Sequence, residues 1–148
     1  MQKWILAGAL LLSITLGAIL YTVFTRPAGM EGTEVTWELL GQMDYISGKT
    51  SDELKSLNGG MVKIPGYMVP LEDSDKHVSE FLLVPTPQAC IHVPPPPPNQ
   101  MVYIKMTTPT ETAYGPIWVY GKLSLTPKKH MYGESSFEME GNAIEVYR

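Results

Sequence analysis

Five consecutive prolines, Pro94 to Pro98, constrain the fold more than any other stretch of this chain. Proline lacks a backbone N–H and fixes φ, so neither an α-helix nor a central strand can pass through such a run. The expected conformation is a polyproline II rod of about 15 Å, at ~3.1 Å per residue. The rod is either a stiff connector, with the amides that follow it satisfying nearby backbone groups, or a segment that a partner binds. The candidate partner-binding residues are Pro94, Pro95, Pro96, Pro97, Pro98, Asn99 and Gln100.

The one cysteine of the chain lies just before the rod, in the apolar stretch Cys90-Ile91-His92. Residues two apart share a face of a strand, so the thiol and the imidazole are expected to point the same way. Both groups suit zinc and copper, and the pair predicts two ligands of a transition-metal site, with zinc ahead of copper. Two alternatives stay open: Cys90 as a small buried hydrophobe, or a thiol that His92 activates as a base. Further metal ligands would come from His77, His130, Asp73, Asp75 or a second chain.

Residues 4–24 form an uncharged, mostly apolar run between Lys3 and Arg26. As a helix this run would be about 31 Å long, which matches the hydrocarbon core of a bilayer. The core of a signal peptide is shorter, at about 7–15 residues, and we therefore expect an uncleaved signal-anchor, with a cleaved signal peptide as the alternative. The two flanking charges balance, so the positive-inside rule gives no firm orientation. The predicted organisation is a transmembrane segment at 1–26, a linker at 27–35 and a β domain at 36–148.

The charge balance is acidic, with 15 acidic and 11 basic residues and a formal net charge of −4. A nucleic-acid-binding domain normally carries a basic surface, so we expect no nucleic-acid partner. A single cysteine allows no disulfide within the chain. No second cysteine is present to resolve a disulfide and no oxyanion device is visible, so we expect a protein that is not an enzyme.

Beyond residue 60 the sequence predicts five short strands, at 61–69, 78–84, 101–106, 117–125 and 143–147. Pro65 and Gly66 interrupt the first strand and predict a bulge or sharp bend on an edge. Five strands with such a bend favour a small OB-like Greek-key barrel, with a small β-sandwich or an open sheet as the alternative. Before them, we predict a helical turn capped by Thr36 and a short helix with Thr50 as N-cap in a capping box with Glu53.

Trp118, Tyr120 and Lys122 follow one another at every second position of the fourth predicted strand. Aromatic side chains in this pattern can stack a ligand, as the bases of nucleic acids stack on OB folds. They can equally pack against neighbouring strands. The acidic balance of the chain favours packing.

Three blocks of sequence carry a resemblance: Gly66 to Glu72 (GYMVPLE), Phe81 to Pro85 (FLLVP) and Ala89 to Gln100 (ACIHVPPPPPNQ). With these blocks the chain resembles a bacterial family catalogued only as a domain of unknown function, over nearly all of residues 33–147. The resemblance implies an envelope protein with an N-terminal signal or anchor, similar to proteins encoded near transport components, and supplies no established activity. The family often has a tyrosine, an aromatic residue and a glycine where this chain has Thr86-Pro87-Gln88.

These observations together predict a single-pass protein of the inner membrane whose β domain lies on the extracytoplasmic, periplasmic side. The expected function is that of an accessory or binding module of an envelope transport system, with Cys90 and His92 binding zinc or copper. The alternative is a protein-interaction adaptor that uses the proline rod and a strand edge and binds no metal. If the N-terminal segment is cleaved, the domain is expected to be soluble in the periplasm. A homo-oligomer is also compatible with the sequence.

Overall fold

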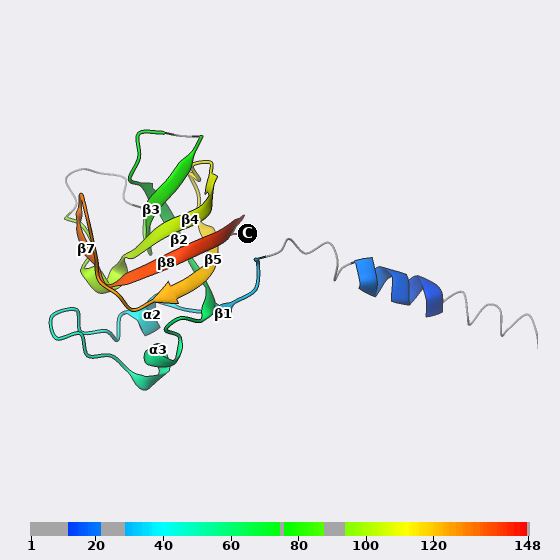
Figure 1. The fold of residues 1–148 in the computed structure, drawn as a ribbon, viewed down its shortest axis with the longest axis horizontal. Helices are drawn as coiled ribbons and strands as arrows, with labels where there is room; N and C mark the ends of the chain where they lie inside the picture. Colours follow the sequence, from blue (N-terminus) through cyan, green and yellow to red (C-terminus); the bar gives the residue numbers. More distant parts are fainter. Residues whose placement is uncertain (1–11, 22–28, 75, 88–93, 148) are drawn as a thin grey trace, which may run out of the picture.

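The structure is a computed structural model that describes residues 12–21, 29–74, 76–87 and 94–147 of the 148-residue chain. Five of its strands close into a barrel (Figure 1). In the order in which they neighbour one another, they are β2 (Met61–Pro70), β3 (Val78–Val84), β4 (Val102–Thr110), β8 (Phe137–Val146) and β5 (Ile117–Ser124), and β5 pairs back with β2. The β4–β8 pair is parallel and the other four pairs are antiparallel. The prediction of a small closed barrel is therefore confirmed, and the alternatives of a sandwich and an open sheet are wrong.

The first strand of the barrel closes the ring by changing partners. Residues Met61–Gly66 of β2 pair with β5, and Tyr67–Pro70 pair with β3. The change occurs at Gly66, where a Cβ atom would approach the carbonyl oxygen of Val84 to 2.7 Å. The interruption at Pro65-Gly66 thus marks the bend, as the sequence indicates. It does not mark an edge, because β2 has partners on both sides.

The last strand is longer than predicted. It begins at Phe137 and not near residue 143, and its first residues alternate between buried Phe137 and Met139 and the more accessible Glu138 and Glu140. This period-two pattern is the usual mark of a half-buried strand. Residues outside the barrel add β1 (Thr33–Glu34), which pairs in parallel with β2, and a small hairpin of β6 (Lys128–His130) and β7 (Gly133–Ser135).

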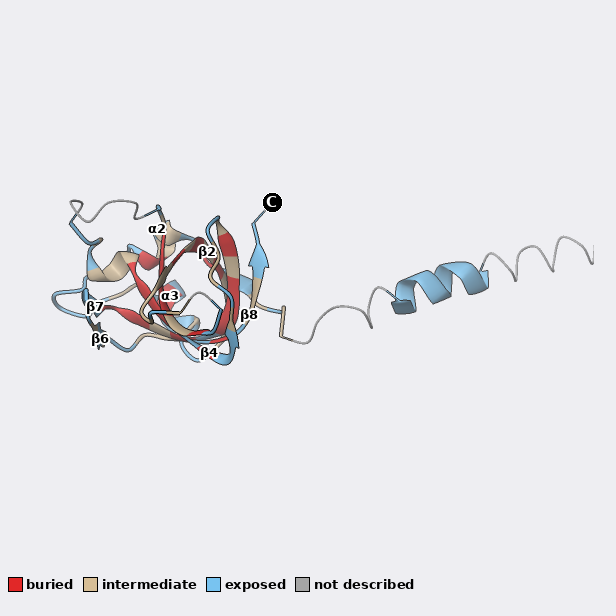
Figure 2. Cartoon of the chain, turned by 90° about the horizontal axis from the view of Figure 1, so that it is seen from above, coloured by how far each residue is buried: buried red, intermediate tan, exposed pale blue. Residues whose placement is uncertain are grey.

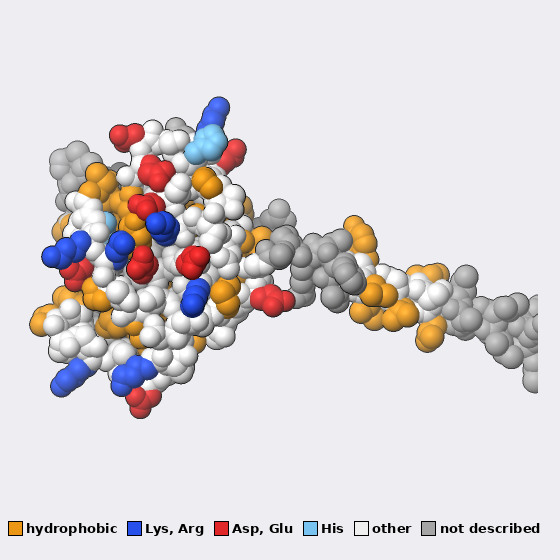
Figure 3. All heavy atoms as spheres, viewed as in Figure 1, with side chains coloured by type: hydrophobic (Ala, Val, Ile, Leu, Met, Phe, Trp, Pro, Cys, Tyr) orange, Lys and Arg blue, Asp and Glu red, His pale blue; other side chains and the backbone are white. Residues whose placement is uncertain are grey.

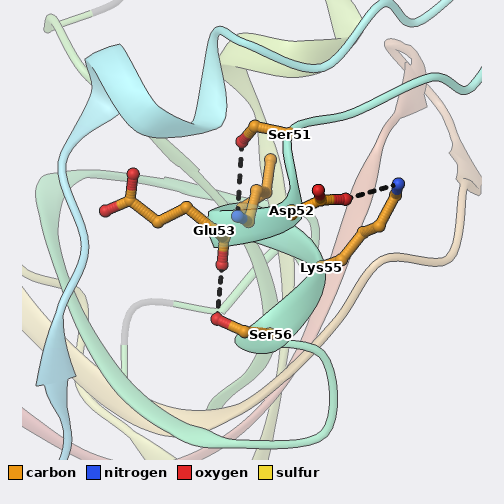
Figure 4. Close-up of polar contacts among 6 residues, drawn as sticks. Ser51, Asp52, Glu53, Lys55 and Ser56 are labelled. Carbon is orange, nitrogen blue, oxygen red and sulfur yellow. Dashed lines mark hydrogen bonds and ion pairs between the residues drawn. The ribbon is translucent and has the colours of Figure 1, made fainter.

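Two short helices precede the barrel, α2 (Trp37–Leu40) and α3 (Asp52–Ser56). The hydroxyl of Thr36 accepts from the N–H of Leu39, so the predicted cap of the first helix is confirmed. The cap predicted for the second helix is wrong by one residue. Its N-cap is Ser51, whose hydroxyl accepts from the N–H of Leu54 at 3.3 Å (Figure 4). The hydroxyl of Thr50 is instead buried without a hydrogen-bond partner.

The main core fills the inside of the barrel. Figure 2 shows the buried residues on the inner side of the ring. Leu40 and Leu54 of the two helices are fully buried in the same cluster, so α2 and α3 close one end of the barrel. The core residues of the strands include Val62, Ile64, Phe81, Leu83, Val102, Ile104, Ile117, Val119, Leu123, Phe137 and Met139.

The part of the predicted membrane segment that the structure describes is helical over residues 12–21. All of these residues are exposed, including Leu12, Ile14, Leu16 and Ile19. Within the described residues, no helix combines the length and the apolarity that a membrane crossing requires. Positions 4–11 and 22–24 of the predicted segment lie outside the described residues.

Candidate functional site

All five prolines, Pro94 to Pro98, belong to the described residues, and the run lies on the surface of the domain. Pro94, Pro95 and Pro97 are exposed, whereas Pro96 and Pro98 are half-buried. Pro97 has φ −62° and ψ 155°, close to the values of polyproline II. The 3₁₀ helix η1 (Pro98–Gln100) ends the run and leads into β4. The backbone is thus extended at Pro97 and turns at Pro98.

The two amide side chains after the prolines fix this segment to α2. Asn99 Nδ2 donates to the carbonyl oxygens of Gly41 at 3.2 Å and Met43 at 2.9 Å, and Gln100 Nε2 donates to that of Trp37 at 3.3 Å. Asn99 thereby gives a partner to two carbonyl groups at and just beyond the C-terminal end of α2, where carbonyl groups lack partners within the helix. Gln100 adds a second donor to the carbonyl of Trp37, which also accepts from the N–H of Gly41. The prediction that Asn99 and Gln100 bond to neighbouring backbone is confirmed.

A shallow open hollow of about 520 Å³ lies beside this junction, lined by Trp37, Glu38, Gly41, Gln42 and Gln100. The indole N–H of Trp37 donates to the carbonyl oxygen of Pro65 at 2.6 Å, which fixes the ring at the wall of the hollow. A Cβ atom at Gly41 would lie 3.0 Å from Gln100 Nε2, so the close contact between α2 and η1 favours glycine. The side chains of Trp37 and Gln100, next to the proline segment, are therefore held by hydrogen bonds.

The predicted metal ligands Cys90 and His92 lie outside the described residues, and the metal site stays a prediction. Asp75 also lies outside them. Elsewhere, across 12–21, 29–74, 76–87 and 94–147, no group of three or more His, Cys, Asp or Glu side chains could hold a metal ion. His77 is exposed in the turn after β2. His130 Nδ1 accepts from the N–H of Tyr132 at 3.3 Å, and burial lowers the pKa of the imidazole.

The aromatic residues of β5 find partners within the domain. The amine of Lys63 lies 4.4 Å from the ring centroid of Trp118, and Tyr147 lies 5.2 Å from Trp118, centroid to centroid. The hydroxyl of Tyr120 donates to Glu145 at 2.8 Å. Burial, followed by this hydrogen bond, raises the pKa of Tyr120. Of the two interpretations offered by the sequence, packing against neighbouring strands agrees with these contacts.

Lys122 borders a groove of about 680 Å³ across β4, β8 and β5, together with Lys105, Glu138 and Glu140. Figure 3 shows lysine and acidic side chains interspersed on this face of the barrel. The four charges balance, so the groove offers no preference for a cation or an anion. The residues that line the groove therefore do not indicate a particular class of ligand.

A second apolar cluster, which the sequence did not predict, lies on the outer face of the barrel. Its buried members are Leu82, Val84, Met101 and Tyr103, with Tyr67, Val69 and Leu71 packed against them. The uninterrupted apolar run 81–84 would have indicated this cluster, because such runs are typical of strands buried on both faces.

Tyr103 is the polar member of this cluster. Burial raises the pKa of Tyr103, and its hydrogen bond to Glu80 and the negative charges of Glu138 and Glu72 raise it further. Lys128 of β6 lies 5.2 Å above the ring of Tyr103 and 3.6 Å from Glu138. The hairpin thus holds a cation against both the ring and the carboxylate.

Comparison with known proteins identifies the family. Residues 38–146 match a family model described as "Protein of unknown function (DUF3299)". No curated protein matches the chain. A crystal structure of a DUF3299 family protein from Pseudomonas aeruginosa PAO1, at 2.45 Å resolution, is similar at a TM-score of 0.66 and 30% sequence identity. The match covers 80% of this chain and 97% of the other. The chain therefore belongs to the DUF3299 family of proteins of unknown function.

Proposed function

We propose that this protein is a membrane-anchored docking module of the bacterial envelope, without catalytic activity, whose proline segment is bound by a partner protein. The observation that carries the proposal is the exposure of Pro94, Pro95 and Pro97 in a segment whose far end is clamped by Asn99 and Gln100. The rings stiffen the segment wherever they lie, because each fixes φ. Exposed rings are in addition accessible to an aromatic groove of a partner.

The pattern of exposed proline rings indicates which edge of the segment a partner would contact. Polyproline II has three residues per turn, so Pro94 and Pro97 lie on the same edge of the rod. Both are exposed, and the half-buried Pro96 occupies a different edge. An aromatic-lined groove can bind such an edge at low entropic cost, because the rod is already ordered before binding.

The strand order supports an OB-like Greek-key class for the barrel, with the parallel β4–β8 pair as its distinguishing feature. In this class the proline segment belongs to the connection between the second and third barrel strands, β3 and β4. Leu83 pairs with Val102, so both ends of this connection meet at one end of the barrel.

Membrane attachment through residues 4–24 is part of the proposal. The exposed apolar side chains of residues 12–20 support it, because such side chains are stable in a bilayer and costly in water. We place the domain on the extracytoplasmic side of the inner membrane, next to an envelope transport complex. Cleavage of the segment would leave the same docking module soluble in the periplasm.

The test is a photo-crosslinking experiment in cells that produce the full chain. A photoreactive amino acid at Pro95 is expected to give one discrete adduct with a partner protein. The double change Pro94→Ala and Pro97→Ala should reduce the yield of this adduct at least tenfold. The matched control Pro109→Ala alters an exposed proline on β4 and should leave the yield unchanged. Absence of any adduct from Pro95 would refute the docking proposal.

Metal binding by Cys90 and His92 is the second candidate, and the spacing of the thiol and the imidazole two residues apart favours it. Native mass spectrometry of residues 30–148, titrated with zinc and with copper(I), tests it directly. One tightly held ion per chain, or one shared by two chains, that is lost in Cys90→Ser would support the metal site. No uptake at micromolar metal would exclude it and leave the adaptor function alone.

A further inference from the structure

The described part of the domain begins close to the proposed membrane segment. A Cβ atom at Gly29 would lie 3.3 Å from the Cβ atom of Asn142 on β8, and β1, a few residues later, pairs with β2. The chain is therefore attached to the barrel from residue 29 onward. Phe24, the last residue of the proposed segment, precedes Gly29 by five positions, and five fully extended residues span at most about 18 Å. This short tether, residues 25–28, keeps the attachment point at Gly29 within that distance of the hydrocarbon core.

The end of the barrel at the C-terminus of β8 lies within the same reach. Tyr147 follows Asn142 by five positions, so this part of the chain and the fully extended tether have similar lengths. The backbone N–H of Tyr147 donates to the carbonyl oxygen of Pro116 at 2.9 Å, which places the loop between β4 and β5 at this end as well. Figure 1 and Figure 2 both show the start of the described domain and the C-terminus on the same side of the barrel. This end can therefore touch the bilayer while residues 4–24 span it.

Three exposed side chains at this end, Tyr114, Val146 and Tyr147, form what we call the C-terminal rim. Their exposed fractions are 87%, 66% and 46%. Tyrosine is enriched where proteins cross the membrane–water interface, because its ring is apolar and its hydroxyl can bond to headgroups and water. The ring of Tyr147 lies 5.2 Å from that of Trp118, centroid to centroid, which fixes one side of the rim to β5. The composition of the rim therefore suits the headgroup layer of a bilayer.

The charged side chains near the rim decide which part of the barrel, and which lipids, make the contact. Glu111 and Glu145 flank the rim in sequence and Glu31 follows Gly29, and all three glutamates are exposed. Lys63, on the flank of the barrel, is already paired with Glu34 at 3.0 Å. A flank with these charges is poorly suited to enter a headgroup layer, whereas the rim itself carries none. The apolar and aromatic side chains of the rim therefore make the contact, and zwitterionic headgroups suit the neighbouring glutamates better than anionic ones.

We propose that the C-terminal rim rests in the headgroup layer of the bilayer that residues 4–24 span. This inference rests on the membrane attachment in the proposed function. The proline segment enters β4 at the other end of the barrel, where Val102 pairs with both Leu83 and Phe137. The 10 residues of β8 join the two ends and cover about 30 Å at ~3.3 Å per residue. Contact at the rim thus directs the proline segment away from the bilayer, where a partner protein can reach it.

The test measures the depth of a fluorescent label on the full chain in phosphatidylcholine vesicles that contain a lipid with a nitroxide quencher in its headgroup. In a Cys90→Ser background, Tyr114→Cys supplies the only thiol for the label. Its quenching should be about threefold stronger than that of a label at Met131→Cys, a 73% exposed position between β6 and β7. In the chain labelled at 114, Val146→Asp should lower the quenching to the level found at 131, because a charge then enters the rim. Met131→Asp, the same change at another exposed apolar residue, should leave it unchanged.

Sedimentation of the same vesicles separates this inference from the proposed function. A full chain that does not sediment with the vesicles refutes the membrane attachment, and with it the rim contact. A chain that sediments but shows equal quenching at 114 and 131, or stronger quenching at 131, refutes the rim contact alone. Stronger quenching at 114 that Val146→Asp leaves undiminished also refutes it, since the apolar side chains would then not make the contact. Stronger quenching at 114 that Val146→Asp abolishes and Met131→Asp retains supports it.

Discussion

The aromatic face of β5 and the proline segment both carry side chains of the types that bind ligands, and they differ in where those side chains find partners. The ring of Trp118 contacts Lys63 and Tyr147, and the hydroxyl of Tyr120 bonds to Glu145. The proline segment is fixed through the amides that follow it, while the rings of Pro94, Pro95 and Pro97 stay exposed. A side chain that is already paired within the domain therefore stabilises the fold. An unpaired group on a fixed backbone is available to another molecule.

The largest loss of stability is expected from a substitution at Trp118. Trp118→Ala removes a half-buried ring and its contacts with Lys63 and Tyr147, so it should lower the free energy of unfolding by about 2 kcal/mol. Urea denaturation measures this change. Tyr114→Ala, at an exposed loop position, serves as the control and should change stability by less than about 0.5 kcal/mol. Equal stability of the two variants would mean that the β5 face is not a packing surface.

A smaller loss of stability is expected when the clamp of the proline segment is removed. Asn99→Ala deletes the donor to the carbonyl oxygens of Gly41 and Met43 and should cost about 1–2 kcal/mol. Amide hydrogen exchange should rise in residues 37–43, since α2 loses its attachment to η1. Asn142→Ala is the matched control, because that exposed amide has a weak contact, from Nδ2 to the sulfur of Met61 at 3.9 Å. Unchanged exchange in α2 would show that the clamp does not order this region.

The smallest effect concerns the outer cluster and appears only at alkaline pH. The pKa of Tyr103 is raised in the folded state, so the folded protein holds its proton where the unfolded chain releases it. The stabilisation is fully present below the unfolded pKa of about 10 and is lost as the pH rises through the folded value. Tyr103→Phe should therefore flatten the decline in stability above pH 10. Tyr45→Phe, at an exposed tyrosine, should retain that decline, and a decline equally steep in Tyr103→Phe would contradict the assignment.

The elements that the sequence predicts well are those with a strong local signal. The bend at Pro65-Gly66 and the proline rod follow from the chemistry of proline and glycine, which acts on the backbone whatever surrounds it. The cap of α3 was predicted one residue early because Thr50 and Ser51 are equally suitable by type. The choice between them depends on the path by which the chain enters the helix.

From the sequence alone followed the positions of the five barrel strands, the last of them only in part, the bend in the first strand, the acidic balance and the stiffness of the proline run. The closure of the strands into a ring and the bonds from Asn99 and Gln100 to the backbone of α2 and of Met43 became apparent only in the tertiary structure. The physical reason is the range of the interactions. Proline geometry and side-chain alternation act over a few residues, whereas the bond from Asn99 to Met43 joins positions 56 residues apart and exists only once the barrel has brought them together.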